Sequence, residues 1–442
     1  MTTGFEVAGG GSLSGRVRVP GDKSISHRSM MLGALADGVT RVSGFLEGAD
    51  AISTMNVFRA LGVRIDGPDN GIVTVHGVGI DGLRPPAAPL DCGNAGTAMR
   101  LLMGLLAGQR FESVLIGDES LSRRPMRRVS EPLALMGARI ETSATGTPPV
   151  RILPADRLKG IDYSMTVASA QVKSAILLAG LYSEGETAVT EPAPTRDHTE
   201  RMLTGFGVTV ERHGARASVR GGQRLRATTL DVPADISSAA FFLVGAAIAP
   251  GSDLLLEHVG MNPTRTGVID ILRLMGAHIE VLSPREVGGE PVADLRVRAG
   301  PLKGIEVPVE LVPLAIDEFP VLFVAAACAQ GRTVVTGAHE LRVKESDRIA
   351  VMADGLAALG IPATATPDGM IIEGLGSEAM PFAGGTVESH GDHRIAMAFA
   401  MAALRARGPI RIRDTANVAT SFPGFTALAA GAGVRIADVD DL

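Results

Sequence analysis

A short motif recurs six times along this chain. In each copy an amphipathic stretch ends at an apolar residue and a glycine, and a short alternating run follows. The glycines are Gly62, Gly137, Gly207, Gly276, Gly360 and Gly433, which lie 69 to 84 residues apart by subtraction of their positions. A glycine in this place is typical of a helix that ends in a left-handed residue, and the alternating run predicts a strand. The chain is therefore expected to repeat one small α/β unit six times.

A second helix is predicted in each unit, in step with the first. It opens on polar residues and continues as an almost wholly apolar run, and its starts lie at 23–24, 94–97, 169–171, 235–238, 317–318 and 392–394. An apolar helix has to be buried, whereas an amphipathic helix lies at the surface. Each unit then holds two strands and two helices. We predict helices packed inside sheets, with the six units divided into two lobes of three.

Cations are concentrated at these helix starts, where the helix dipole disfavours them. Lys23, Arg28, Arg100, Lys173 and Arg394 all lie within about a turn of a predicted N-terminus. The free N–H groups of a helix N-terminus bind anions, and cations beside them are useful when they do so. An ordinary capped helix with surface cations explains one such start taken alone. Its recurrence favours a site for polyanions.

Three further segments are dense in charge. Residues 122–128 carry four arginines, which suit bidentate binding of carboxylate or phosphate, although a solvated basic helix start is the alternative. Residues 341–348 alternate cations and carboxylates, as an exposed helix laced with salt bridges also does. Residues 390–394 place two histidines beside an aspartate. They have no third ligand at a suitable spacing, so we predict no metal and no cofactor.

Composition limits the partners. A net charge of −6, an aromatic content of 3% and the absence of tryptophan argue against nucleic acid, since base stacking needs rings. The longest apolar runs are too short to span a bilayer, and no secretory leader opens the chain. Two cysteines, Cys92 and Cys328, suit a reducing compartment. We therefore expect a cytoplasmic monomer that binds small molecules, without nucleic acid or membrane.

The assembled motifs resemble those of the 5-enolpyruvylshikimate-3-phosphate synthase family, essentially from end to end. The segments that carry the resemblance are 20–28 (PGDKSISHR), 93–100 (GNAGTAMR), 124–125 (RP), 169–171 (SAQ), 342–348 (RVKESDR) and 392–394 (DHR). The resemblance implies an inside-out α/β barrel of two lobes, each of three βαβαββ units, which close over the substrates. It implies one lobe at 20–233, a second lobe formed by 1–19 and 234–442, and an active site in the cleft between them.

The resemblance also implies the reaction, a step of the shikimate pathway to the aromatic amino acids. The 5-hydroxyl of shikimate 3-phosphate adds to phosphoenolpyruvate, and phosphate then leaves the tetrahedral intermediate. Shikimate 3-phosphate would be held by Lys23, Ser24, Arg28, Ser169, Ala170, Gln171, Arg196, Asp317 and Lys344. Phosphoenolpyruvate would be held by Lys23, Gly96, Thr97, Arg124, Gln171, Arg348 and Arg394. The catalytic residues implied are Asp317 at the hydroxyl, Glu345 as proton donor to the methylene carbon, and Lys23 at the departing phosphate.

Some positions depart from the better-known form of the family. Ala170 stands where a second serine is common, and Thr420 where a lysine that binds phosphoenolpyruvate often lies. Arg196 falls in a segment that replaces one containing tyrosine. These features are similar to the second, glyphosate-tolerant subgroup. Gly96 is instead the residue of glyphosate-sensitive members, so we expect glyphosate to inhibit in competition with phosphoenolpyruvate.

Two alternatives stay open at this point. The sister transferase that acts on UDP-N-acetylglucosamine shares the fold, but it places a cysteine in the loop that corresponds to 117–124, where this chain has none. A non-catalytic α/β scaffold that binds anions such as RNA is the alternative from another class. The acidic net charge and the presence of Lys23, Asp317 and Glu345 count against it.

Overall fold

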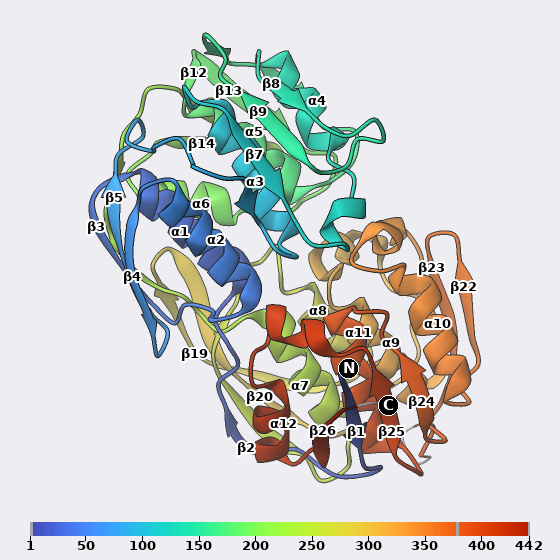
Figure 1. Cartoon of the computed structure of the whole chain (residues 1–442). Helices are drawn as coiled ribbons and strands as arrows, with labels where there is room; N and C mark the ends of the chain where they lie inside the picture. Colours follow the sequence, from blue (N-terminus) through green and yellow to red (C-terminus); the bar gives the residue numbers. More distant parts are fainter. Residues whose placement is uncertain (1–2, 377–379, 441–442) are drawn as a thin grey trace. The chain divides into compact units, whose positions relative to one another are not determined.

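The structure is a computed structural model that describes residues 3–376 and 380–440 (Figure 1). The chain divides into two compact units. Unit I comprises 21–232 and 287–290, and unit II comprises 1–20, 233–286 and 291–442. The predicted boundaries place the short segment 287–290 with unit II. It groups with unit I instead, where the Glu290 carboxylate lies 2.8 Å from Nδ1 of His198.

Unit I holds three inner helices that are buried over most of their length. These are α1 (Lys23–Leu35), α3 (Gly96–Ala107) and α5 (Ala170–Gly180). Three amphipathic helices accompany them: α2 (Ala49–Ala60), α4 (Arg127–Leu135) and α6 (His198–Gly205). The inner helices approach one another closely because glycine lies at the contact. A methyl group added to Gly104 of α3 would lie 2.0 Å from the carbonyl oxygen of Ala175 in α5.

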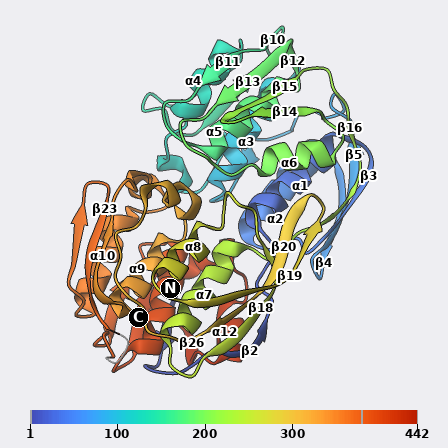
Figure 2. The same ribbon diagram turned by 180° about the vertical axis from the view of Figure 1, so that it is seen from behind.

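Three sheets, one of five strands and two of four, cover these helices in unit I. The first runs β17 (Thr229–Asp231), β3 (Ala36–Ser43), β5 (Ile72–Val78), β4 (Arg64–Asp69), with β16 (Leu225–Arg226) also on β3. The second runs β6 (Leu90–Asp91), β7 (Ser113–Ile116), β9 (Val150–Leu153), β8 (Arg139–Glu141). The third runs β11 (Asp162–Ser164), β13 (Glu186–Thr190), β15 (Arg216–Arg220), β14 (Val210–His213), and Figure 2 shows β13, β15 and β14 beside α5. A short pair joins β10 (Leu158–Lys159) to β12 (Ser183–Glu184).

Unit II repeats this plan. Its buried helices are α7 (Ile236–Ile248), α9 (Phe319–Cys328) and α11 (His393–Ala402), and its outer helices are α8 (Gly267–Leu274), α10 (Arg348–Ala358) and α12 (Phe425–Ala432). Its first sheet runs β2 (Ser14–Val17), β18 (Asp253–Gly260), β20 (Glu290–Arg298), β19 (His278–Val287). The second runs β21 (Gln330–Val335), β23 (Gly369–Leu375), β22 (Ala363–Thr366). The third runs β24 (Gly385–Glu388), β25 (Ile410–Arg413), β1 (Thr3–Val7), β26 (Ile436–Asp440). Short 3₁₀ segments include η1 (Leu121–Arg123), η4 (His339–Val343) and η6 (Ala416–Thr420).

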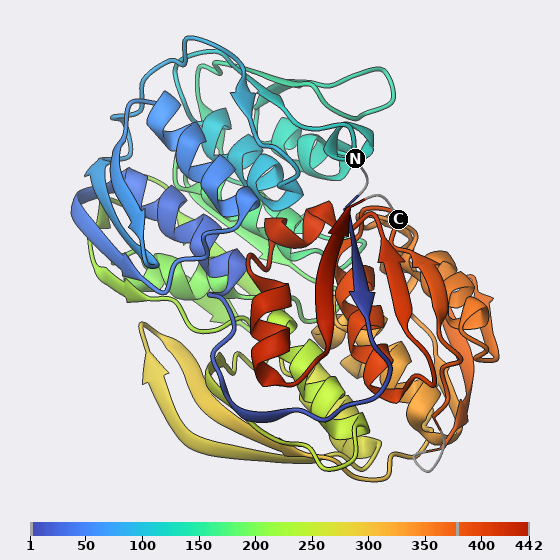
Figure 3. The same ribbon diagram turned by 60° about the horizontal axis from the view of Figure 1, so that its bottom comes forward.

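The sheets share one order, and strands from distant parts of the chain complete three of them. In five sheets the first strand pairs in parallel with the second, as β6 does with β7. The blue N-terminal strand β1 lies between the red strands β25 and β26 in Figure 3. Strand β2 similarly completes the sheet of β18, and β17 completes that of β3. The α/β class with inner helices is confirmed, whereas the unit of two strands inferred from the residues alone was too small, because strands of two or three residues leave no readable alternation.

The six recurrent glycines end the outer helices, as predicted. Their φ angles are positive: 89° at Gly62, 94° at Gly137, 84° at Gly207, 99° at Gly276, 85° at Gly360 and 121° at Gly433. Each is followed by a backbone bond back into the last turn, such as Val63 N to the Phe58 carbonyl at 3.0 Å. Together with the bond from Gly62 N to the Arg59 carbonyl at 3.0 Å, it forms the Schellman arrangement, which turns the chain into the next strand. Across the described ranges, no helix has both the length and the apolar character needed to cross a membrane.

Candidate active site: cations at the starts of buried helices

The start of α1 in unit I carries the first predicted binding residues. The Asp22 carboxylate accepts a hydrogen bond from the Ile25 N–H at 2.9 Å, and this cap begins the helix at Lys23. The Lys23 ammonium forms an ion pair with the buried carboxylate of Asp50, in the first turn of α2. Asp50 was not predicted as a site residue. It fits an ordinary acidic helix start, and nothing in its spacing connects it with Lys23.

Arg28 lies one turn further along α1 and is almost fully buried. Its Nε donates to Thr199 Oγ1 at 2.7 Å, its Nη1 to the Ser24 carbonyl at 3.0 Å and its Nη2 to Ser174 Oγ at 3.0 Å. Burial lowers the pKa of Arg28 to about 10, against the opposing charge of Glu200, and the guanidinium stays charged at neutral pH. A buried cation that is held by hydroxyl and carbonyl groups is suited to an incoming anion.

The starts of α3 and α5 are joined by side-chain hydrogen bonds. Gln171 in the first turn of α5 donates through Nε2 to Thr97 Oγ1 at 2.9 Å, and its Oε1 accepts from Arg100 Nη1 at 2.7 Å. Ser169 caps α5 through a 3.4 Å bond from the Val172 N–H, and Ala170 is the first residue of that helix. The structure therefore brings Gln171 and Thr97 together, although 74 residues separate them.

Arg124 follows η1 and is held against the start of α3. Its Nη2 donates to Asn94 Oδ1 at 2.8 Å and to Ser120 Oγ at 3.1 Å. Gly96 lies between two guanidinium groups, because a methyl group there would be 3.1 Å from Arg124 Nη1 and 3.2 Å from Arg100 Nη1. An anion on the backbone N–H groups at this start would meet both positive charges.

Arg196 occupies the segment that precedes α6 and is half-buried. The positive charge of Arg196 lowers the pKa of Arg28. This effect is smaller than those of burial and of nearby carboxylates. In the same region, the buried Lys173 ammonium lies 2.8 Å from Glu200 and 3.1 Å from Glu191. Lys173 therefore serves an internal ion-pair cluster, which is the structural alternative to anion binding by this residue.

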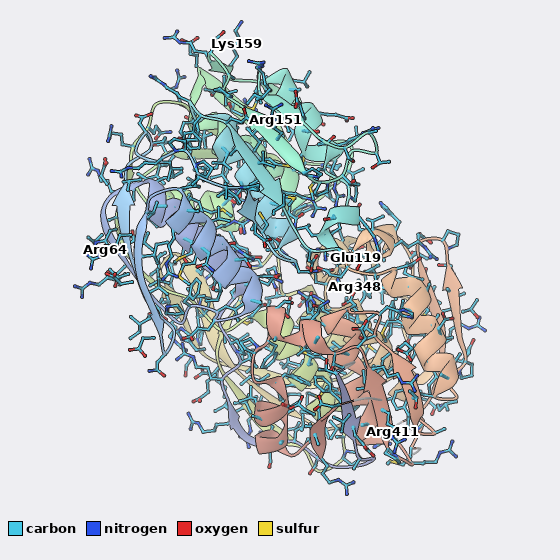
Figure 4. The ribbon with its side chains drawn as sticks, viewed as in Figure 1. Arg64, Glu119, Arg151, Lys159, Arg348 and Arg411 are labelled. Carbon is cyan, nitrogen blue, oxygen red and sulfur yellow. The ribbon has the colours of Figure 1, made fainter. Side chains whose placement is uncertain are left out.

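In unit II, Arg348 is the centre of the predicted site. Its side chain is fully buried, whereas those of Arg151 and Arg64, which are also labelled in Figure 4, are exposed. Its Nε donates to Asp392 Oδ2 at 2.8 Å, its Nη1 to Asp317 Oδ1 at 3.1 Å and its Nη2 to Glu345 Oε2 at 2.6 Å. Burial by itself would lower the pKa of Arg348, but the three carboxylates outweigh it and raise the pKa. One guanidinium thus holds both predicted catalytic carboxylates.

Lys344 and Arg394 complete this cluster. The Lys344 ammonium lies 3.4 Å from Asp317 Oδ1, and Arg394 Nη1 donates to the Asp317 carbonyl at 3.3 Å. Asp392 also caps α11 by accepting from the Arg394 N–H at 3.0 Å. Thr420, at the position where the family often has a lysine, is buried in η6 and donates to the Asn417 carbonyl at 2.7 Å.

The predicted residues thus fall into two sets. Unit I holds Lys23, Ser24, Arg28, Gly96, Thr97, Arg124, Ser169, Ala170, Gln171 and Arg196, and unit II holds Asp317, Lys344, Glu345, Arg348 and Arg394. Direct contacts join Arg28 with Ser24 and Gln171 with Thr97; in unit II, Arg348 contacts Asp317 and Glu345, and Lys344 contacts Asp317. Within the residues that the structure describes, no His, Cys, Asp and Glu side chains form a group of three that could hold a metal ion.

Comparison with known proteins decides the family. The family model of EPSP synthase (3-phosphoshikimate 1-carboxyvinyltransferase) matches residues 7–428. The chain belongs to the EPSP synthase family. It is 68% identical to the 3-phosphoshikimate 1-carboxyvinyltransferase of Alkalilimnicola ehrlichii over 98% of this chain and 96% of that one. It is 67% identical to the enzyme of the same name from Methylococcus capsulatus, with 98% of each chain covered.

Solved structures agree with this assignment. The structure of EPSP synthase from Acinetobacter baumannii matches with a TM-score of 0.89 and 58% sequence identity, and the match covers 100% of both chains. The EPSP synthase family model therefore selects among the interpretations that the sequence left open. Neither the sister transferase nor the anion-binding scaffold is favoured.

Proposed function

We propose that the two sets of residues take different parts in the reaction of this member of the EPSP synthase family. The enzyme transfers the enolpyruvyl group of phosphoenolpyruvate to the 5-hydroxyl of shikimate 3-phosphate. Arg28, Ser24, Ser169, Gln171, Arg196 and Lys23 bind shikimate 3-phosphate at the starts of α1 and α5, with Asp317 and Lys344 at its ring hydroxyls. The support is physical: polar helix starts and a buried, hydroxyl-bonded guanidinium suit phosphate and carboxylate.

Phosphoenolpyruvate is proposed to lie on Gly96, Thr97, Gln171, Arg124 and Lys23 in unit I, and on Arg348 and Arg394 in unit II. The flanking of the Gly96 backbone by Arg124 and Arg100 supports the first part. Four N–H bonds of Arg348 already reach carboxylates. One of its five N–H groups is left, so a substrate carboxylate that binds Arg348 through two N–H groups has to displace one of the four bonds, and the Glu345 bond to Nη2 is the one whose release frees a proposed acid.

The proposed chemistry balances as an addition followed by an elimination. The oxygen of the 5-hydroxyl bonds to C2 of phosphoenolpyruvate and its proton passes to Asp317, while Glu345 gives a proton to the methylene carbon. In the second step the methyl group returns a proton to Glu345, the C–O bond to phosphate breaks with its electron pair on the oxygen, and the proton held by Asp317 passes to the departing phosphate, so both carboxylates return to their starting state. Lys23 balances the charge on the departing phosphate. The single observation that carries this assignment is Arg348, since it holds Asp317 and Glu345 at 3.1 and 2.6 Å from the same guanidinium.

Phosphate release in the presence of both substrates tests the proposal. We expect release that needs shikimate 3-phosphate and phosphoenolpyruvate together, and that falls by about 10² or more in Lys23→Met and Glu345→Gln. Substitution of exposed Arg64, which pairs with Asp66 away from these residues, serves as the control and leaves the rate unchanged. Full activity in folded Lys23→Met would overturn the role of Lys23. We also propose a monomer, which sedimentation at micromolar concentration tests.

A further inference from the structure

We infer that Thr199 is a positioning residue that orients Arg28 for the oxyanion of shikimate 3-phosphate. This inference rests on the role proposed above for Arg28. Thr199 lies in the first turn of α6, and Arg28 lies on α1 of another repeat. Thr199 is 1% exposed and Ser174, its neighbour on α5, is fully buried. Neither belongs to a motif that the sequence singled out.

Arg28, Thr199 and Ser174 form a closed ring of hydrogen bonds. Thr199 Oγ1 accepts from Arg28 Nε at 2.7 Å and donates to Ser174 Oγ at 2.7 Å, and Ser174 Oγ accepts from Arg28 Nη2 at 3.0 Å. The hydroxyl pair therefore occupies the Nε–Nη2 edge of the guanidinium group. Because Nε and Nη2 are both engaged, the group cannot turn about the Cδ–Nε bond without breaking two hydrogen bonds.

The ring determines which donors face a ligand. A guanidinium has five N–H groups, and the bonds to Thr199, Ser174 and the Ser24 carbonyl use three of them. One N–H on Nη1 and one on Nη2 remain. These two N–H groups, on adjacent nitrogens, are the pair of donors left for a carboxylate or phosphate. Removing the Thr199 hydroxyl would free the plane to turn, so that the pair no longer points consistently.

The backbone that carries Thr199 is itself anchored. The adjacent Glu200 forms an ion pair with Lys173 of α5 at 2.8 Å, with both side chains 2% exposed. Lys173 and Ser174 are consecutive, so the ion pair fixes α6 against α5 beside the hydroxyl pair. Thr199 is thus held at one distance from Arg28, as a positioning residue has to be.

The test measures the affinity of the full-length enzyme for shikimate 3-phosphate by titration calorimetry, because the chain has no tryptophan for a fluorescence signal. The variants are Thr199→Val, which removes the hydroxyl and keeps the shape, and Thr199→Ser, which keeps it. Thr187→Val is the matched control. Thr187 is also a fully buried threonine paired with a serine hydroxyl, that of Ser183 at 3.0 Å, but its hydroxyl makes no bond to an arginine of the described ranges.

We expect Kd for shikimate 3-phosphate to rise about tenfold in Thr199→Val, as for a weakened charged hydrogen bond, with KM for phosphoenolpyruvate unchanged. Thr199→Ser is expected to restore wild-type affinity. Thr187→Val is expected to keep wild-type affinity, even if both this variant and Thr199→Val have a lower melting temperature. If Thr199→Val does not fold, Ser174→Ala opens the ring from the other side and is expected to give the same change.

A double-mutant cycle with Arg28→Met separates this inference from the proposal beneath it. If Thr199 acts through Arg28, then Thr199→Val has no further effect on Kd in the Arg28→Met background. An equal loss in both backgrounds, or unchanged affinity in Thr199→Val alone, overturns the positioning role. Unchanged affinity in folded Arg28→Met overturns the role proposed for Arg28 itself, and the inference with it.

Discussion

Replacing Gly96 by alanine tests the proposed phosphoenolpyruvate site with a single methyl group. The added carbon would lie 3.1 Å from Arg124 Nη1, 3.2 Å from Arg100 Nη1 and 3.5 Å from Leu121 Cδ1. The first two separations are tighter than ordinary contact, so both guanidinium groups have to move by a few tenths of an ångström. Each is tied elsewhere, Arg124 to Asn94 at 2.8 Å and Arg100 to Gln171 at 2.7 Å, and therefore yields only in part.

The magnitude follows from how much of each bond is lost. A displaced but still charged donor loses part of the ~1.5–3 kcal/mol of a charged hydrogen bond, and we expect KM for phosphoenolpyruvate to rise roughly threefold to tenfold. For glyphosate, which we propose to compete for the same place, the methyl group also overfills the site. Overpacking costs ~1–3 kcal/mol, which is roughly 5- to 150-fold in the inhibition constant. Alanine should therefore weaken the inhibitor more than the substrate.

The fold itself should tolerate this change. Gly96 is the first residue of α3 and its φ lies outside the left-handed region, so alanine fits the backbone and stabilises it by ~0.4–1 kcal/mol at best. Gly205→Ala is the matched control, because that helical glycine has no atom within 4 Å of an added methyl group. Steady-state phosphate release at varied phosphoenolpyruvate and glyphosate gives both constants. Unaltered constants in folded Gly96→Ala would refute the placement of either ligand on this helix start.

Three further outcomes are expected. Glu345→Gln should lower kcat by about 10² or more and leave the calorimetric Kd for shikimate 3-phosphate unchanged; a large change in Kd would contradict a purely proton-transferring role. Asp392→Asn removes a carboxylate from the buried Arg348 and should lower the free energy of unfolding by about 2–3 kcal/mol in urea titrations while raising KM for phosphoenolpyruvate. His27 is buried, and burial together with Lys23 and Arg28 lowers its pKa well below 6.5. Below about pH 6.5 the unfolded chain therefore binds a proton that the native state does not bind. The free energy of unfolding should fall there by up to ~1.4 kcal/mol for each unit that the pH is lowered. His27→Asn should flatten that slope; equal slopes would show that His27 is not its source.

The repeat was readable from sequence because each copy is bounded by local chemistry. A left-handed glycine is required where the chain leaves an outer helix, and Gly62 and its five counterparts all adopt that conformation. Side-chain caps such as Asp22, Asp235 and Asp392 mark the inner helices in the same local way. The strands that the residues alone did not reveal are β6, β11 and β17, of two or three residues each. Pairing with a neighbouring strand creates them, and no local pattern encodes it.

The site residues also differ in whether the sequence alone could reveal them. Residues at helix starts, such as Lys23, Gln171 and Arg394, lie in segments whose local composition is unusual, so the sequence could single them out. Their partners could not be found in this way. Asp50 meets Lys23 through packing between the two helices of one repeat, and Thr199 meets Arg28 through packing between helices of different repeats. Residues 171 positions apart carry no mutual signal in a single sequence.

Arg28 and Arg348 show how one fold makes two kinds of charged site. Both guanidiniums are buried, and burial disfavours their charge. The bonds of Arg348 go to three carboxylates, which raise its pKa, whereas those of Arg28 go to two hydroxyls and a carbonyl, and its pKa falls to about 10. The carboxylates of Glu200, Asp22 and Glu290 oppose this fall in the pKa of Arg28 only in part. Under the proposed assignment, Arg348 orients the two carboxylates of the proton-transfer steps, whereas Arg28 binds an anion of shikimate 3-phosphate.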